Sequence, residues 1–503
     1  MNRASLSSPS GILTHDGKSK FRLWPEATRT YERTGILILI AASILIGISS
    51  AVWGIYPGVL VIGLWVIPGV YSIVAYPRFG ITVLLLMAYM LFMIIRLGIN
   101  FPWGTTLDGI QLLLILGFFA HQKTAPDWSV FRGPIATWVG IWVIYNLLQF
   151  GNPTAESRMS WLYTVRTTAS VTLMYYIFMY HIRTVSFIRF LVKMWLVLAF
   201  IGAAYAFKQE YFGFSAAEQA WLNSDPLIAD LLFINGHWRK YSIFSDPVSF
   251  SYNMVVSSLL CLGVLKAARQ SWKKIVLLCL MGFYLFTMLF SGTRGAYVLI
   301  PAGFALFAIL NLNRTILILS IIGAVFFIGL IFVPTSNTTL YRFQSAFKPS
   351  NDDSFNLRSY NQKRIQPFIQ SHPFGGGLGA TGVWGQRFAP HSFLANFPPD
   401  SGYVRVAVEL GWVGLFIFCM LMYTILKTGI NNYYNIKNPE LKAYCLAMTL
   451  IVYALNVGNY PQEALVQFPT SIFFYVAVAL INCTYLLDQK EQEAVGQGLS
   501  KTV

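Results

Sequence analysis

Four arginines lie beside or within apolar stretches of this sequence: Arg166, Arg239, Arg294 and Arg358. Arg294 occupies the tight turn at 291–295, which joins two apolar segments and leaves no room for a soluble domain. An arginine at the edge of a membrane is costly, so by default it marks a site with an anionic partner. Because the planar guanidinium group fits phosphate oxygens in bidentate geometry, these residues predict a site for a phosphate or diphosphate.

Few acids are available to neutralise these cations, so pairing leaves a surplus of positive charge. The nearby acids are Asp246, Asp352, Asp353, Asp400 and Glu409. Glycines of the 291–295 turn and of the run 375–379 would add backbone N–H donors that approach such a ligand closely. Two of the arginines also have a simpler interpretation, since Arg166 could snorkel to lipid headgroups and Arg239 could anchor the chain at the interface.

Asp400 is the first candidate for a general base, because the Pro-Pro turn before it fixes it at the mouth of an apolar segment. His391 is the second candidate, since it could reach the same region if the loop folds back. A base beside a reacting hydroxyl contributes roughly 10²–10⁴-fold to a rate. The alternative for Asp400 is that it caps the helix that begins before Tyr403. Inside that helix, Glu409 favours a structural role with a polar partner, such as one of the four arginines.

The composition indicates which elements position these residues. The chain has 503 residues, of which 56% are hydrophobic and 11% are charged, and its mean hydropathy is +0.57. These values exclude a soluble multidomain protein, and apolar runs of about 17–22 residues indicate transmembrane helices rather than barrel strands of about 10 residues. We therefore predict an all-α, polytopic membrane protein with about 12–14 transmembrane helices. The expected spans are 35–52, 55–75, 79–97, 106–121, 134–150, 162–181, 187–207, 248–265, 275–291, 296–312, 315–333, 403–426, 443–458 and 468–487.

Basic residues in the short connections predict how the chain is oriented. Lys and Arg gather in alternate connections, which the positive-inside rule assigns to the cytoplasm. We expect a cytoplasmic tail at 1–34, one membrane domain over 35–487 and a second cytoplasmic tail at 488–503. The long polar loops 208–247 and 334–402 would then both be extracytoplasmic and form a partly helical cap. A polar loop as long as the second one is typical of a functional segment.

Three stretches resemble the O-antigen ligase and polymerase superfamily of bacterial envelope glycan enzymes, namely residues 291–297, 357–379 and 400–415. Residues 239–250 are similar to a fourth patch of that family, and the order of the patches agrees with the expected topology. The resemblance covers roughly residues 160–425. It implies a helical membrane glycosyltransferase whose donor is an undecaprenyl-diphosphate-linked glycan and which uses neither a metal nor a nucleotide cofactor.

The resemblance also implies roles for single residues. The arginines that hold the diphosphate in this family correspond by motif position to Arg166, Arg239, Arg294 and Arg358. Ligases of the family carry a His-Asn pair just before the tyrosine of the last motif, whereas this chain has Asp400 and Ser401 there. The departure favours a polymerase of O-antigen or exopolysaccharide over a ligase.

The expected partners are the lipid-linked donor, a glycan or lipid-linked acceptor and membrane lipids, with a chain-length regulator as a further candidate and no nucleic acid. The site is expected on the periplasmic face of the bacterial inner membrane. One alternative is an O-antigen ligase acting on a lipid A core or another acceptor. Another class of protein, a flippase for lipid-linked sugars, would show two similar halves and ionisable residues near midspan. Here the halves differ and the cations gather at one face.

Overall fold

A computed structural model describes residues 55–98, 101–124, 126–234, 236–336, 338–347 and 353–496. The chain divides into two compact units, Met1–Ser72 and Ile73–Val503. In the first unit, the described residues are those of helix α2 (Ile55–Ala75) up to Ser72. The predicted tail 1–34, the predicted span 35–52 and the acid Asp352 lie outside the described residues.

Helices make up nearly all of the described structure, and this confirms the predicted all-α, polytopic membrane class. Nine helices in the described ranges are long and apolar enough to cross a membrane, by length and composition. They are α3 (Pro77–Arg96), α4 (Trp103–Thr124), α7 (Val185–Tyr211), α10 (Pro247–Leu265), α11 (Ser271–Met288, extended by the short helix η3, Leu289–Ser291), α13 (Arg314–Phe332), α17 (Gly402–Asn435), α18 (Pro439–Gly458) and α19 (Thr470–Gly496). Three others coincide with the remaining predicted spans after α2, namely α5 (Pro134–Leu148), α6 (Arg158–His181) and α12 (Arg294–Leu310).

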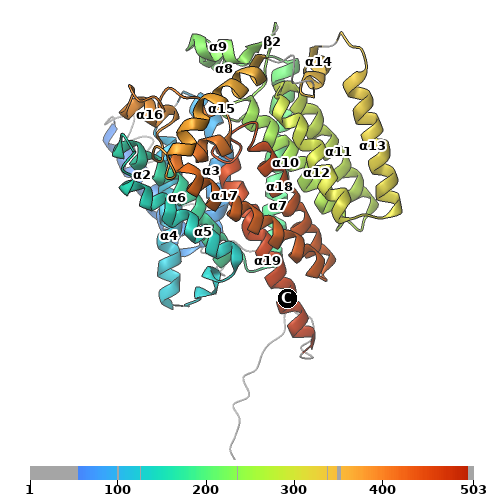
Figure 1. Cartoon of the computed structure of the whole chain (residues 1–503). Helices are drawn as coiled ribbons and strands as arrows, with labels where there is room; N and C mark the ends of the chain where they lie inside the picture. The colour runs from blue at the N-terminus through green and yellow to red at the C-terminus, as the bar shows by residue number, and fades with distance from the viewer. Residues whose placement is uncertain are drawn as a thin grey trace, which may run out of the picture. The chain divides into compact units, whose positions relative to one another are not determined.

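The centre of the second unit is formed by α10, α18 and α19. In α10 and α18, 83% of the apolar stretch is buried inside the protein, and in α19 78% is buried. Helix α13 is the opposite case, because none of its apolar stretch is buried, and Figure 1 shows it at the edge of the unit beside α11 and α12. A helix that is apolar all round yet unburied is suited to contact with lipid.

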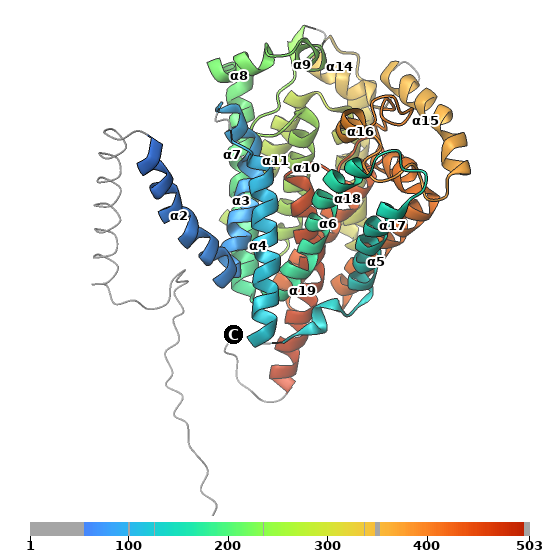
Figure 2. The same cartoon turned by 90° about the vertical axis from the view of Figure 1, so that its left-hand side faces the viewer.

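Short helices from the two long polar loops lie at one end of the bundle, as Figures 1 and 2 both show. Loop 208–247 contributes α8 (Ala216–Leu222), α9 (Pro226–Leu232) and the antiparallel pair β1 (Phe233–Ile234) and β2 (His237–Trp238). Loop 334–402 contributes α14 (Thr338–Ser345), α15 (Asp353–Ser371) and α16 (Gly382–Phe388). The two loops therefore share one end of the bundle and are partly helical, and which side of the membrane this end faces stays a prediction.

The glycine run at 375–379 packs against a break in α17. Gly411 has φ 70° and ψ −176°, which interrupts the helix. The broken turn receives the loop by backbone hydrogen bonds, since Gly376 N donates to Val408 O at 2.9 Å and Gly377 N donates to Glu409 O at 2.9 Å. These amides are thus used within the protein, and the expectation that the run offers free donors to a ligand is wrong for these two glycines.

Gly375→Ala tests this packing, and Gly382→Ala is its matched control. Both glycines have similar positive φ, +72° and +69°, so alanine at either position costs about 1–2 kcal/mol of backbone strain. At Gly375 the new Cβ would also lie 2.5 Å from the Glu409 carbonyl oxygen, whereas nothing lies within 4 Å at Gly382. We expect Gly375→Ala to lose about 1–3 kcal/mol more than Gly382→Ala, measured by thermal unfolding in detergent; equal losses would contradict the packing.

Candidate active site

The loop arginine Arg239 is buried against the turn that contains Arg294. Its Nε donates to the Ser291 carbonyl oxygen at 2.8 Å, and its Nη2 donates to Thr293 Oγ1 at 3.0 Å. Lys240 N donates to Phe290 O at 3.0 Å, so the loop backbone is fixed to the same turn. The predicted proximity of Arg239 to the 291–295 turn is therefore present in the structure.

Arg342, on the helix α14, is the third arginine at this turn. Its guanidinium occupies the space that a side chain at Gly292 would fill, and Gly292 has the left-handed φ of +58°. Arg342 and Arg294 both interact electrostatically with Tyr297, one turn into α12. The Tyr297 hydroxyl is buried and has no hydrogen-bond partner among the described residues. We call Arg239, Arg294 and Arg342 the arginine cluster.

The cluster places like charges in a poorly solvated environment. Burial, followed by repulsion from Arg342, lowers the pKa of Arg239 to about 10. Burial also lowers the pKa of Arg342, and Arg294 adds to that effect. The acid that opposes this for Arg239 is Asp246. Its carboxylate is engaged as the N-cap of α10, where Oδ1 accepts from Val248 N at 2.7 Å.

Arg358 and Asp400 are close enough to interact electrostatically. Burial raises the pKa of Asp400, and the positive charge of Arg358 acts in the opposite direction. Arg358 also interacts electrostatically with Tyr252 on α10. The Tyr252 hydroxyl donates to Gly458 O at 3.1 Å, and a Cβ added at Gly295 would lie 2.7 Å from it. Tyr252 therefore links the pair Arg358 and Asp400 to the turn of the arginine cluster.

Asp400 does not cap α17. Its backbone adopts φ +48°, and the N-cap is the next residue, Ser401, whose Oγ accepts from Val404 N at 3.5 Å. The alternative interpretation of Asp400 as the helix cap is thus wrong by one residue. The Asp400 carboxyl group therefore does not cap the helix, is half-buried and has a raised pKa. A carboxyl group of this kind is suited to accept a proton.

Arg166 and His391, the other two predicted site residues, have different surroundings. Arg166 Nε pairs with Asp108 Oδ2 of α4 at 3.0 Å, and Figure 1 shows α4 and α6 on the side of the unit away from α11 and α12. His391 is exposed after α16, and the adjacent Ser392 Oγ donates to Glu156 at 2.9 Å. The structure thus brings Arg239 and Arg294 to one turn, Arg358 and Asp400 interact electrostatically with each other, and Arg166 pairs with Asp108 instead.

Glu409 has the structural role that the sequence favours, although its partner is none of the four predicted arginines. Its buried carboxylate accepts from Gly379 N at 2.9 Å and pairs with Arg405 Nε at 3.2 Å. It also accepts from the hydroxyl of Thr381. Arg405 Nη1 pairs in turn with Glu463 at 2.7 Å. Glu409 therefore ties the glycine run to α17 on the inner side of the loop.

A cavity of about 220 Å³ lies below the start of α17, among α5, α6, α17 and α19. Much of its lining is polar for a membrane interior, and it includes Thr167, Thr168, Arg405, Glu409 and Asn459. Both side-chain amide atoms of Asn459 and the hydroxyl of Ser471 are buried without a hydrogen-bond partner among the described residues. Gly402 N donates to Asn459 O at 2.9 Å, so this cavity begins near Asp400.

Neither Asn459 nor Arg342 was identified as a site residue from the sequence. The signal for Asn459 was available, because a buried amide between two apolar segments requires polar partners. For Arg342 no local signal exists, since its contact with Gly292 joins parts of the chain that are fifty residues apart in sequence.

Two comparisons show which proteins this chain is similar to. Residues 275–419 match the family model described as O-Antigen ligase, and this segment contains Arg294, Arg342, Arg358 and Asp400. Together with the relative described below, the match supports the O-antigen ligase and polymerase superfamily as the class of this multi-pass membrane protein. The resemblance predicted from the motifs is thereby confirmed.

The relative is an O-antigen polymerase of Salmonella muenchen. It is 25% identical to this chain over 257 residues. The aligned region covers 49% of this chain and 61% of the Salmonella protein, so the match spans less than two thirds of that protein.

Replacing Glu409 with glutamine should weaken the attachment of the glycine run. In Glu409→Gln the new amide NH₂ group faces donors such as Gly379 N, and one of the two acids that pair with Arg405 is removed. We therefore expect the free energy of unfolding to fall by about 2–4 kcal/mol. Glu463→Gln is the control, because it removes the other acid and leaves the loop contacts in place. Thermal unfolding in detergent measures both, and a Glu409 variant as stable as the Glu463 variant would contradict the assignment.

Proposed function

We propose that this protein is a membrane glycosyltransferase of the O-antigen polymerase type. Its donor would be an undecaprenyl-diphosphate-linked glycan, and its acceptor a sugar hydroxyl of a second glycan, at the periplasmic face of the inner membrane. The observation that carries this proposal is the arginine cluster. Arg239, Arg294 and Arg342 gather around one turn at the end of an apolar bundle, and guanidinium groups held together in this way suit the adjacent charges of a diphosphate.

In this proposal the cluster binds the diphosphate of the donor. The acceptor oxygen forms a bond to the anomeric carbon as the bond from that carbon to the diphosphate oxygen breaks, and the leaving group keeps the electron pair. Guanidinium groups that the fold already holds in place stabilise the charge that develops on this oxygen. Because Arg239 is held by Ser291 and Thr293, little reorganisation is needed when the ligand binds.

Asp400 would act as the base that takes the proton of the acceptor hydroxyl. Burial makes its carboxylate more basic, and the neighbouring Arg358 keeps it ionised. The polar cavity next to Gly402 lies on the same side as Asp400, and its free amide and hydroxyl groups suit the hydroxyl groups of a sugar. The acceptor would therefore approach along α17 and the donor along α12.

An O-antigen ligase is the second candidate, because the matching family model carries that description. The printed name of the Salmonella relative, O-antigen polymerase, favours polymerisation. The two functions differ in their product, since a polymerase lengthens the glycan on the carrier lipid and a ligase moves it to a different acceptor. Purified protein in nanodiscs with a synthetic lipid-diphosphate glycan distinguishes them by whether lipid-linked chains lengthen.

Arg294→Ala should reduce glycan transfer by about 10²–10³-fold, because one donor to the leaving diphosphate is lost. Arg294→Lys should also be impaired, since a point charge does not replace a planar fork. The measurement is release of undecaprenyl diphosphate by the purified full chain in nanodiscs. Arg158→Ala is the control, because Arg158 lies at the same end of the bundle and donates to Phe150 O at 2.7 Å outside the cluster. Equal activity of the Arg294 and Arg158 variants would reject the role.

Arg358→Gln should shift the pH dependence of transfer. The base form of Asp400 exists only above its pKa, so activity should rise with pH through that pKa, which burial places above the usual range of Asp. Removing the positive charge of Arg358 raises this pKa further, so the pH of half-maximal turnover should move upward. Asp400→Asn should abolish this acid limb together with turnover. An unshifted half-maximum in Arg358→Gln, or an active Asp400→Asn, would remove Asp400 as the base.

A further inference from the structure

A large cavity lies at the end of the bundle opposite to the cap loops. It has a volume of about 1480 Å³ and is formed by α7, α11, the connection between α10 and α11, and the ends of α18 and α19. It shares no residue with the arginine cluster or with Asp400. It is larger than the polar cavity beside α17 and has no role in the proposed transfer.

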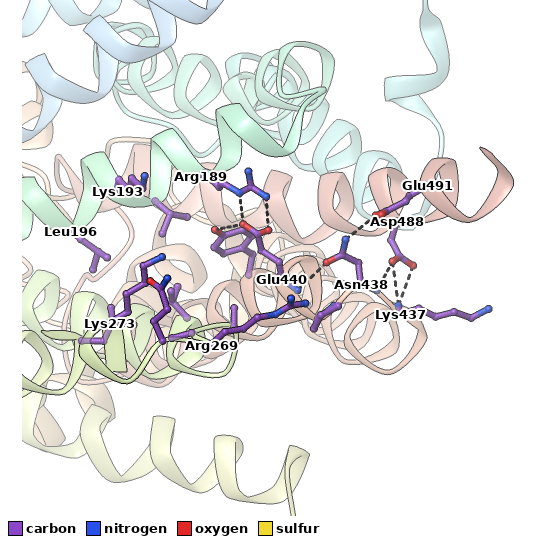
Figure 3. Close-up of a pocket in the computed structure, with 18 of the residues that line it drawn as sticks. Arg189, Lys193, Leu196, Arg269, Lys273, Lys437, Asn438, Glu440, Asp488 and Glu491 are labelled. Atoms are coloured by element: carbon purple, nitrogen blue, oxygen red, sulfur yellow. Dashed lines mark hydrogen bonds and ion pairs between the residues drawn. The ribbon is translucent and has the colours of Figure 1, made fainter. Parts of the chain in front are cut away.

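The acidic and basic side chains around this cavity differ in their partners within the protein. Its basic residues are Arg189, Lys193, Arg269, Lys273 and Lys437, and its acidic residues are Glu440, Asp488 and Glu491. Each acid is engaged by the protein: Glu440 accepts from Arg189, Asp488 accepts from the backbone N–H groups of Lys437 and Asn438, and Glu491 accepts from Asn438 Nδ2. Figure 3 shows these contacts as dashed lines.

Arg269 interacts electrostatically with Glu440, and two of the remaining cations, Lys193 and Lys273, lie away from Asp488 and Glu491. Figure 3 shows Lys193 and Lys273 on the facing helices α7 and α11, on the side of the cavity away from Asp488 and Glu491. Both lysines are exposed, as is Arg269 beside them. Lys193 and Lys273 therefore give this part of the cavity a positive surface, and the described acids that line the cavity form their hydrogen bonds with other residues.

The wall behind these lysines is apolar. Leu196, Leu277 and Leu280 line the cavity on the bilayer side of the lysines, and Val276 is 46% exposed next to them. Trp272, 62% exposed, lies at the rim, where an indole ring suits the boundary between headgroups and hydrocarbon. A free phosphate ion would use the cations and leave this apolar wall unused.

We propose that this cavity binds an anionic phospholipid, with its phosphate at Lys193, Arg269 and Lys273 and its acyl chains along α7 and α11. Basic pockets between transmembrane helices are suited to anionic headgroups, because the charge of the lipid is complementary and its chains remain in hydrocarbon. The lipid would fill the gap between α7 and the N-terminal half of α11 and so join two helices at this end of the bundle.

The test is native mass spectrometry of the full chain in detergent, titrated with phosphatidylglycerol or phosphatidylethanolamine that carry the same acyl chains. Phosphatidylglycerol should bind more tightly. Each lysine at a membrane surface contributes about fivefold to the binding of an anionic lipid. We therefore expect Lys193→Gln with Lys273→Gln to weaken phosphatidylglycerol binding by at least tenfold and leave phosphatidylethanolamine binding unchanged.

Lys123→Gln is the matched control, because Lys123 is an exposed lysine in the last turn of α4 and does not line the cavity. The two single lysine variants, each expected to lose about fivefold, provide the comparison if the double variant unfolds. Two outcomes would overturn the proposal. One is equal affinity for the two lipids, with no effect of the lysine variants. The other is displacement of phosphatidylglycerol by millimolar inorganic phosphate, which would make the cavity a site for a free anion.

Discussion

The crowding of guanidinium groups at one turn is the constraint on which the rest of this structure depends. Arg239, Arg294 and Arg342 come from a loop, a helix start and a second loop, and Arg239 and Arg342 bring their charges into a poorly solvated region. Repulsion among them and loss of hydration both oppose this arrangement. Neutral acceptors such as Ser291 O compensate in part and fix the groups in place. The fold therefore holds three guanidinium groups close together around one turn.

The backbone around α17 holds the neighbouring carboxyl group in position. The break at Gly411 allows the glycine run to pack directly on the helix, and Glu409 adds a charged contact from inside it. Because these contacts fix both ends of the segment between the glycine run and α17, Asp400 has a defined position next to Arg358. Loop 334–402 thus carries both Asp400 and Arg342, one of the cluster arginines.

The sequence predicted the membrane helices well, because a span requires a long apolar run and leaves an unmistakable pattern. Every predicted span from 55–75 onward coincides with a helix. The site was predicted less completely. Arg239 and Arg294 do meet, but Arg166 was grouped with them by motif position, and its actual partner is Asp108 on a neighbouring helix. Which cations converge is decided by helix packing, and no local pattern in a single sequence records that.

The position of α13 has a consequence for a substrate with a long hydrocarbon tail. None of the apolar stretch of α13 is buried, and the chain continues from it into α14. Gln344 of α14 donates to Leu330 O of α13 at 2.9 Å. Arg342 therefore lies on α14, directly after a helix that has little buried contact with the rest of the protein. Displacing α13 exposes little buried surface and so costs little free energy. In the proposed function, the isoprenoid chain of the donor would stay in the bilayer outside α13 while its headgroup passes sideways to the arginines.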